Sequence, residues 1–333
     1  MSANPRQLGL PSPNERRTGR GPRIGYHPAV ADGPSATPED RNAVGLGYAV
    51  LAYGSWGLFP LFWKQLGGIA PLELVAHRVC WAALAYLGLI LVRGRARELA
   101  RTLAVPSRLP TILGSSLLIG INWLVFVYAI STARVMHASL GYFLNPLVSI
   151  VLGMVFLGER MRTGQWFAVA IAGLGVIQLA GLAEGLPWIG IVLALSFGGY
   201  GLLRKVAPVD GLMGATIESL VLVPIAAAYL VWLALGHAGA MGTMSLRVDA
   251  LLVCAGFVTA APLVWFANAA RLLPLRTLGF TQYLAPTLQF ALAVAVFGEP
   301  LGAVQLRGFA CIWTALLVFV GESWWSARRA DPP

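Results

Sequence analysis

The chain reads as a series of long apolar runs separated by short polar segments. After residue 43, each run is close to the roughly 20 residues that an α-helix needs to cross a bilayer. Because many connecting segments are short, neighbouring helices are expected to pack antiparallel. The pattern predicts an all-α polytopic membrane protein with ten transmembrane helices, over residues 44–63, 71–92, 111–131, 137–157, 165–182, 187–203, 212–235, 249–270, 277–297 and 304–324.

The composition agrees with a membrane class. Charged residues make up 11% of the 333 residues and hydrophobic residues 57%, whereas soluble domains carry about 25% charged residues. The net charge of +10 comes from short basic bursts between apolar runs, and no basic stripe is interleaved with polar aromatic residues. We therefore expect the lipid bilayer, and not nucleic acid, as the partner surface. Cys80, Cys254 and Cys311 lie inside apolar runs and are interpreted as packing residues, not disulfides or metal ligands.

The positive charges also predict an orientation. Of the 24 Lys and Arg residues, nineteen fall in the N-terminal segment and in the segments on its side, four fall on the other side, and Arg78 lies inside a span. Cytoplasmic segments carry the excess of Lys and Arg, so both termini are expected in the cytoplasm. Residues 1–43 lack the apolar region of a signal peptide and are rich in Pro, Gly and Arg. They are predicted to be a disordered cytoplasmic tail, and residues 325–333 a short C-terminal one.

Two segments of the chain repeat. "LNPLVSIVLGMVFLGERMRTGQW" begins at Leu144 and "LAPTLQFALAVAVFGEPLGAVQL" at Leu284, which aligns Pro146 with Pro286 and Glu159 with Glu299. The repeat divides the chain into two five-helix halves, residues 44–182 and 187–324. An odd number of spans in each half inverts the second half relative to the first. Inverted repeats are typical of secondary transporters, whose substrate sites lie near the bilayer midplane.

The stretches "HRVCW", "NWLVFVYAI", "ASLGYFLNPLVSIVLGMVFLGER", "TLGFTQYLAPTLQFALAV" and "FGEP" resemble the RarD group of EamA-type transporters, within the drug/metabolite transporter superfamily. The resemblance covers about residues 44 to 324. It implies a ten-helix inner-membrane carrier with two EamA repeats, and export as the direction of transport. The first span carries no Asp or Glu, so the proton-antiport mechanism of the small multidrug-resistance relatives is not expected to apply.

The second predicted span has an unusual charged cluster, formed by Glu73, His77 and Arg78 in its first turns. Intramembrane ionisable residues usually face the bundle interior and mark a substrate path, which makes Arg78 the first candidate for substrate binding, with His77 beside it. The alternative is that Arg78 snorkels to the headgroups while Glu73 and His77 pair across the boundary. Glu73 is also a candidate for ion coupling, together with Glu218 of the seventh span.

Further polar and aromatic residues recur in both halves. Pro146 and Pro286 are expected to kink their helices and to expose backbone polarity near the midplane; the alternative is a packing role alone. Intramembrane amides and rings of the third, fourth and ninth spans are further candidates for binding the substrate, against the alternative that each ring only packs. These are Asn122, Trp123, Tyr142, Asn145, Gln282 and Tyr283.

Enzyme motifs are missing from the sequence: there is no HExxH, Cys-x-x-Cys, G-x-S-x-G or P-loop pattern. The sequence implies no cofactor and no metal. It therefore predicts a non-enzymatic carrier of the cytoplasmic membrane that moves, and by resemblance exports, a small metabolite or drug-like solute by alternating access. The alternative is a channel or a membrane sensor without coupled transport. The sequence specifies neither the substrate, nor the coupling ion, nor the oligomeric state.

Overall fold

The computed structural model describes residues 37–132, 134–181, 188–298 and 302–330, and every regular element within these ranges is a helix. Nine of these helices are long and apolar enough to cross a membrane, which confirms the predicted all-α membrane fold. They are α1 (Pro38–Trp63), α2 (Pro71–Val92), α4 (Leu109–Ser131), α5 (Val135–Leu157), α6 (Thr163–Ala180), α7 (Trp188–Val206), α8 (Gly211–Leu235), α9 (Leu246–Leu272) and α12 (Ala303–Ala330).

The ninth predicted span, over residues 277–297, is not one helix. It is divided into α10 (Leu275–Gln282) and α11 (Leu284–Ala295), with the interruption at Tyr283. Pro286 lies three residues later, and it has no N–H to donate to the carbonyl of Gln282, with which its ring also collides in a regular helix. In the first half, by contrast, α5 continues through Pro146.

Helix ends differ from the prediction mainly in the polar segments. α1 begins at Pro38 because Thr37 and Asp40 form a capping box, in which the Thr37 hydroxyl accepts from the Asp40 amide at 3.1 Å. The last helix extends to Ala330. The predicted tails, 1–43 and 325–333, are therefore helical at their inner ends, and residues 1–36 lie outside the described ranges. The basic segment after α2 contains a short helix that was not predicted, α3 (Ala96–Leu103), and two single 3₁₀ turns occur at η3 (Lys64–Leu66) and η4 (Pro106–Arg108).

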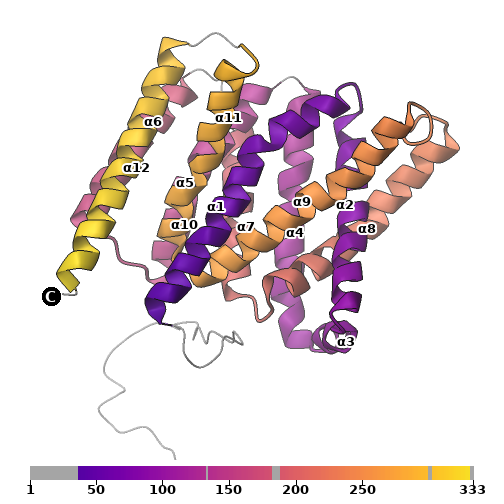
Figure 1. Ribbon diagram of the computed structural model, residues 1–333, viewed down its shortest axis with the longest axis horizontal. Coiled ribbons are helices and arrows are strands. Elements are labelled where there is room, and N and C mark those ends of the chain that lie inside the picture. The colour runs from indigo at the N-terminus through magenta and orange to yellow at the C-terminus, as the bar shows by residue number, and fades with distance from the viewer. Residues whose placement is uncertain (1–36, 133, 182–187, 299–301, 331–333) are drawn as a thin grey trace, which may run out of the picture.

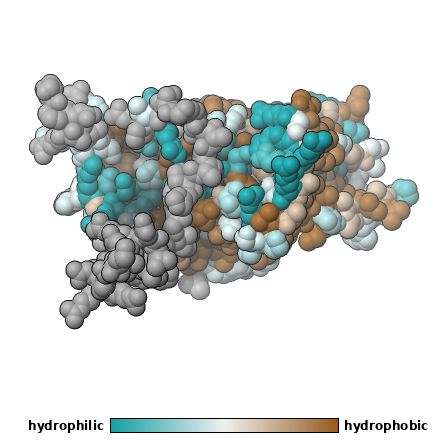
Figure 2. All heavy atoms as spheres, turned by 90° about the horizontal axis from the view of Figure 1, so that it is seen from below, coloured by the Kyte–Doolittle hydropathy of each residue, from teal (hydrophilic) through white to brown (hydrophobic). Residues whose placement is uncertain are grey.

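The long helices stand side by side, so that their links gather at two ends of the bundle (Figure 1). The upper end in that view carries the α1–α2, α4–α5 and α8–α9 links. The lower end carries the α2–α3, α7–α8 and α9–α10 links. Figure 2 looks onto the lower end, where hydrophilic side chains gather on an otherwise apolar molecule.

Helices that correspond in the two predicted halves have corresponding neighbours. The pair α2 and α8, the pair α6 and α12, and the pair α5 and α10 each pack together. The contact of α1 with α9 is matched by that of α7 with α4, and the contact of α2 with α9 is matched by that of α8 with α4. This is the packing that results when a twofold rotation exchanges the halves.

Candidate functional site

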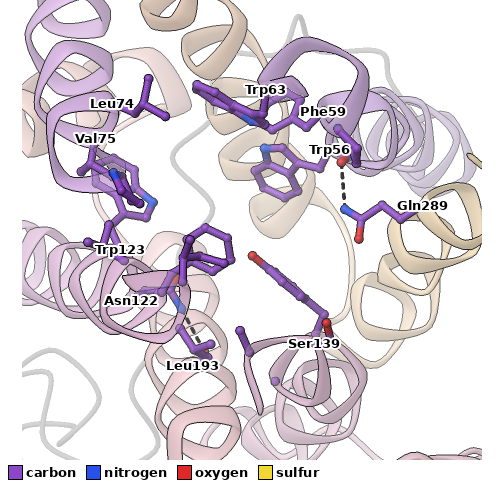
Figure 3. Close-up of a pocket in the computed structure, with 18 of the residues that line it drawn as sticks. Trp56, Phe59, Trp63, Leu74, Val75, Asn122, Trp123, Ser139, Leu193 and Gln289 are labelled. Atoms are coloured by element: carbon purple, nitrogen blue, oxygen red, sulfur yellow. Dashed lines mark hydrogen bonds between the residues drawn. The ribbon is translucent and has the colours of Figure 1, made fainter. Parts of the chain in front are cut away.

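A cavity of about 550 Å³ opens between the helices in the upper half of the bundle. Its walls come from α1, α2, α4, α5, α7, α10 and α11, and its rim includes the exposed link residues Gly67 and Gly68. Figure 3 shows Trp56, Trp63, Trp123 and Asn122 arranged around the open space. Helices of both predicted halves contribute to the walls, so the cavity lies between the two halves.

Arg78 lies in the wall of this cavity, so its side chain faces the bundle interior. Its guanidinium lies over the ring of Trp123, with Cζ 4.4 Å from the ring centroid, a distance typical of a cation–π contact. The buried Nε atom has no hydrogen-bond partner. The ion pairs found among the described residues join other side chains. Arg78 therefore presents a positive charge to the cavity that no carboxylate of these residues neutralises.

Aromatic rings form part of the remaining wall. One face of α1 contributes Trp56, Phe59 and Trp63 at helical spacing, and Phe126 and Phe197 come from α4 and α7. The ring of Trp56 packs edge-on against Phe197, with centroids 5.6 Å apart. Such a wall offers flat apolar contact to a solute body while Arg78 offers a charge.

Four of the polar candidates from the sequence also line the cavity: Asn122, Tyr142, Asn145 and Gln282. The amide nitrogen of Asn122 is engaged by α7, since it donates to the Leu193 carbonyl at 3.0 Å. By contrast, the buried Oδ1 of Asn145 has no partner. Tyr142 has 41% of its surface exposed although it lies inside the bundle, because it borders the cavity.

Three candidates lie elsewhere. The ring of Tyr283 is fully buried, and its hydroxyl donates to the Phe143 carbonyl at 3.3 Å. The carboxylate of Glu73 accepts a hydrogen bond of 2.6 Å from the Ala240 amide and lies 3.8 Å from Nε2 of His77. Glu73 and His77 are both buried but do not line the cavity. Glu73 therefore holds the α8–α9 link, and only Arg78 of the three clustered residues faces the open space.

Glu218 belongs to a separate polar cluster in the lower half of the bundle. Its carboxylate accepts from the Ser115 hydroxyl at 2.5 Å and from the Tyr200 hydroxyl at 3.1 Å, and it pairs with Arg204 at 3.4 Å. Arg204 has no exposed surface. Its guanidinium occupies the space beside Gly214, where an added Cβ would lie 1.7 Å from Nη1. The cluster joins α4, α7 and α8 below the cavity.

The two prolines have different surroundings. Pro286 lines the cavity, directly after the interruption at Tyr283. Pro146 does not, but its carbonyl oxygen lies against α10 at Gly279, where an added Cβ would approach it to 2.8 Å. Their role in shaping the cavity remains a prediction.

Five residues of the cavity wall were not predicted from the sequence: Trp56, Phe59, Trp63, Phe197 and Gln289. The side-chain amide of Gln289 donates to the Trp56 carbonyl at 3.1 Å. The spacing of the three rings on one face of α1 was the available signal. An aromatic face of a membrane helix is equally typical of lipid contact, so that signal did not separate the two cases.

A family model described as "EamA-like transporter family" matches residues 43–180. An uncharacterized transporter of Vibrio cholerae is 44% identical and covers 85% of this chain and 94% of its own. The protein RarD of Escherichia coli is 41% identical, over 85% of this chain and 96% of its own. A chloramphenicol-sensitive protein RarD of Pseudomonas aeruginosa is 34% identical, over 81% and 90%. A solved crystal structure with 17% identity has a TM-score of 0.66 over 85% of this chain and 98% of its own, which shows the same fold.

Proposed function

The chain belongs to the EamA-like transporter family, in its RarD group, and from that premise we propose that it is a secondary carrier working by alternating access. The observation that carries the proposal is the cavity itself. Its lining includes Gly67 and Gly68 of the exposed α1–α2 link at the upper end, and its other lining residues reach only to the middle of the helices, as Asn122 and Asn145 do. Among the described residues, no lining residue comes from the lower end of the bundle, which favours a carrier open to one side over a channel.

The substrate we propose is a small solute with an anionic or zwitterionic group and a flat or apolar body. Arg78 binds the anionic group, because its planar guanidinium donates two parallel hydrogen bonds to a carboxylate. Trp123 supports the guanidinium from one side. Asn145, whose buried amide oxygen lacks a partner, accepts a hydrogen bond from the polar part of the solute. Glu73 and Glu218 remain the candidates for ion coupling.

Two inverted five-helix halves, joined between α6 and α7, move relative to each other in this proposal. The corresponding packing partners of the helices support it. Pro286 and the interruption at Tyr283 give the cavity-lining chain a point at which α10 and α11 can change their mutual angle. Pro146, at the equivalent place in α5, has the same role in the other half.

We further propose that the protein lies in the cytoplasmic membrane with both termini in the cytoplasm and that it exports its substrate. The excess of Lys and Arg at the lower end supports this orientation. The cavity then faces the outside.

The first experiment compares metabolites in deletion and overexpressing cells without preselecting compounds. Any compound that accumulates in one strain and falls in the other is then tested for flux in proteoliposomes. We expect saturable flux driven by a gradient. Flux that never saturates would favour the channel alternative, and a bound compound without any flux would favour a sensor. Chemical conversion of the compound in the same vesicles would indicate an enzyme.

A further inference from the structure

A carboxylate from the first half binds the start of a helix from the second half at the lower end. Glu159 follows α5, and its two carboxylate oxygens accept hydrogen bonds from the backbone amides of Leu275 at 2.7 Å and Arg276 at 3.1 Å. These are the first two residues of α10. The N-terminus of a helix carries a partial positive charge and unpaired N–H groups, so a carboxylate there is bound by both.

The backbone around Glu159 is built for this contact. Gly158 ends α5 with a φ of 65°, in the left-handed region that glycine adopts readily, and it turns Glu159 back toward the bundle. Earlier in α5, the space beside Gly153 has no room for a side chain. A Cβ added there would lie 3.0 Å from Glu159 Oε2 and 3.0 Å from Leu275 Cβ. The absence of a side chain at Gly153 therefore allows the carboxylate and α10 to meet.

A second charged residue holds the same corner from the other side. The ammonium of Lys205 donates to the carbonyls of Ala270, at 3.3 Å, and Leu273 at the end of α9. The corner between α9 and α10 thus has its carbonyls bound by a cation and its amides bound by an anion. This is the charge arrangement that helix ends favour. Lys205 belongs to the second half, so of these two residues only Glu159 makes a contact between the halves. Beside it, the guanidinium of Arg276 donates to the Arg160 carbonyl at 2.9 Å.

The helices joined by Glu159 are also helices of the cavity wall. Tyr142 and Asn145 on α5, and Gln282 at the end of α10, line the cavity. Ser149 lies one turn below Asn145 and is buried, with 6% of its surface exposed. A path from the cavity to the lower end along α5 therefore passes Ser149 and then the contact of Glu159 with α10.

We propose that Glu159 is the latch that keeps the lower end shut while the cavity is open at the upper end. This inference rests on the alternating access proposed above. In the opposite conformation α5 and α10 separate at the lower end, and Glu159 releases the two amides. Loss of the carboxylate charge then shifts the population toward the conformation that is open at the lower end.

The test measures water access at both ends of the protein in lipid nanodiscs, where both ends meet the solvent. Cys80, Cys254 and Cys311 are first replaced by serine. One reporter is Ser149→Cys, below the cavity, and the other is Ser139→Cys in the cavity wall. The rate of labelling by a membrane-impermeant maleimide is measured for each reporter, with and without Glu159→Gln.

We expect Glu159→Gln to raise the labelling rate at Ser149→Cys roughly tenfold, the effect of losing one charge-assisted hydrogen bond, and to lower the rate at Ser139→Cys by a smaller factor. The matched control is Glu322→Gln, which removes a carboxylate of α12 that pairs with Arg162 and whose hydrogen bond and ion pair, among the described residues, do not involve α10. We expect no change from it. Equal rates with and without Glu159→Gln would overturn the proposal, and so would faster labelling at both reporters, which indicates general loosening.

A second variant keeps the test decisive if Glu159→Gln does not fold. Gly153→Ala leaves the carboxylate in place and pushes the contact apart, while Gly321→Ala in α12 adds a methyl group where nothing lies within 4 Å. We expect the first to reproduce the reciprocal change and the second to have no effect.

Failure of the latch is distinguishable from failure of the carrier. Unchanged labelling together with intact flux in proteoliposomes contradicts only the latch, whereas the reciprocal change without any flux contradicts only the carrier.

Discussion

The guanidinium of Arg78 lies over the ring of Trp123, with Cζ 4.4 Å from the ring centroid, on two neighbouring helices of the cavity wall. The contact explains how a cation is kept inside an apolar bundle without an acidic neighbour among the described residues. The negative face of the ring offsets part of the charge, and a guanidinium that lies over a ring can still donate hydrogen bonds to a ligand through its N–H groups. Trp123 is thus a positioning residue for Arg78.

Replacing Trp123 is expected to weaken substrate binding while leaving the charge in place. A cation–π contact contributes about 0.5–2 kcal/mol, so Trp123→Leu should raise the substrate concentration needed for half-maximal flux by roughly two- to thirtyfold. Trp123→Phe keeps a ring and should have a smaller effect. Kinetics of flux in proteoliposomes check this. If Trp123→Leu lowers only the maximal rate and not the apparent affinity, the ring does not position Arg78.

The buried pair Arg204–Glu218 is expected to act on stability. Removing one partner leaves an uncompensated buried charge, at a cost of about 3–5 kcal/mol, whereas replacing both by apolar residues is often neutral. Arg204→Met should therefore lower the thermal unfolding midpoint in detergent, and Arg204→Met with Glu218→Leu should recover much of the loss. Arg307→Met, on an exposed arginine that bonds within its own helix, is the control. A double variant less stable than either single one would contradict the pairing.

The sequence was sufficient to place nearly all the spans, because long apolar runs are a local property of the chain. The hydrophobic pattern did not predict the interruption of the ninth span. The run over residues 277–297 is apolar enough for one helix, yet the helix is interrupted at Tyr283, before Pro286, whereas α5 continues through the aligned Pro146. The proline removes a donor in both helices, so the surrounding contacts decide whether the helix is interrupted. The short helix α3 was missed for the opposite reason, since its polar composition resembles that of a loop.

The candidate site was harder to predict because it depends on how each helix is rotated. Arg78 and Asn145 were found from their unusual chemistry in an apolar run. His77, next to Arg78, faces away from the cavity, and neighbours on a helix point about 100° apart. Arg204 was counted as a loop charge, since nothing local indicates that Gly214 leaves space for it. Contacts between helices distant in the sequence determine both outcomes.

At the lower end, Arg95 forms ion pairs with both Glu98 and Asp210. This triad predicts a dependence of stability on pH. The hydrogen bond from Arg95 lowers the pKa of Glu98. Burial raises the pKa of Asp210, but hydrogen bonds from Arg95 and the Met213 amide outweigh burial, and the net shift is downward. Carboxyls with lowered pKa values stabilise the folded state fully above their ordinary pKa, near 4, and lose that contribution as the pH falls through the folded value.

We therefore expect the thermal unfolding midpoint to fall as the pH is lowered below about 4. In Arg95→Gln the midpoint should be lower at neutral pH and should change less over the same acid range, because both carboxyls lose the partner that lowers their pKa. The measurement is thermal unfolding of the purified protein in detergent at a series of pH values. Parallel curves for the two proteins would show that the triad does not contribute.

The proposed orientation predicts where fused reporters are found. A reporter placed after Trp325 is expected in the cytoplasm, and one placed within residues 237–244, in the α8–α9 link at the upper end, is expected outside. Reporters active only on one side of the membrane, such as a fluorescent protein and a periplasmic phosphatase, make this measurement. An odd number of predicted spans lies between residues 237–244 and Trp325. Two fusions that report the same side would therefore contradict the ten-span arrangement.

The central claim is that the protein carries a solute whose anionic group binds Arg78. Counterflow in proteoliposomes tests it most directly, with the compound identified from the metabolite comparison loaded inside and its labelled form outside. We predict saturable uptake of the label in the unmodified protein, reduced uptake in Arg78→Lys, which keeps the charge but loses the planar fork, and none in Arg78→Ala, with all three proteins inserted to the same level. Uptake by Arg78→Ala equal to that of the unmodified protein would contradict the claim.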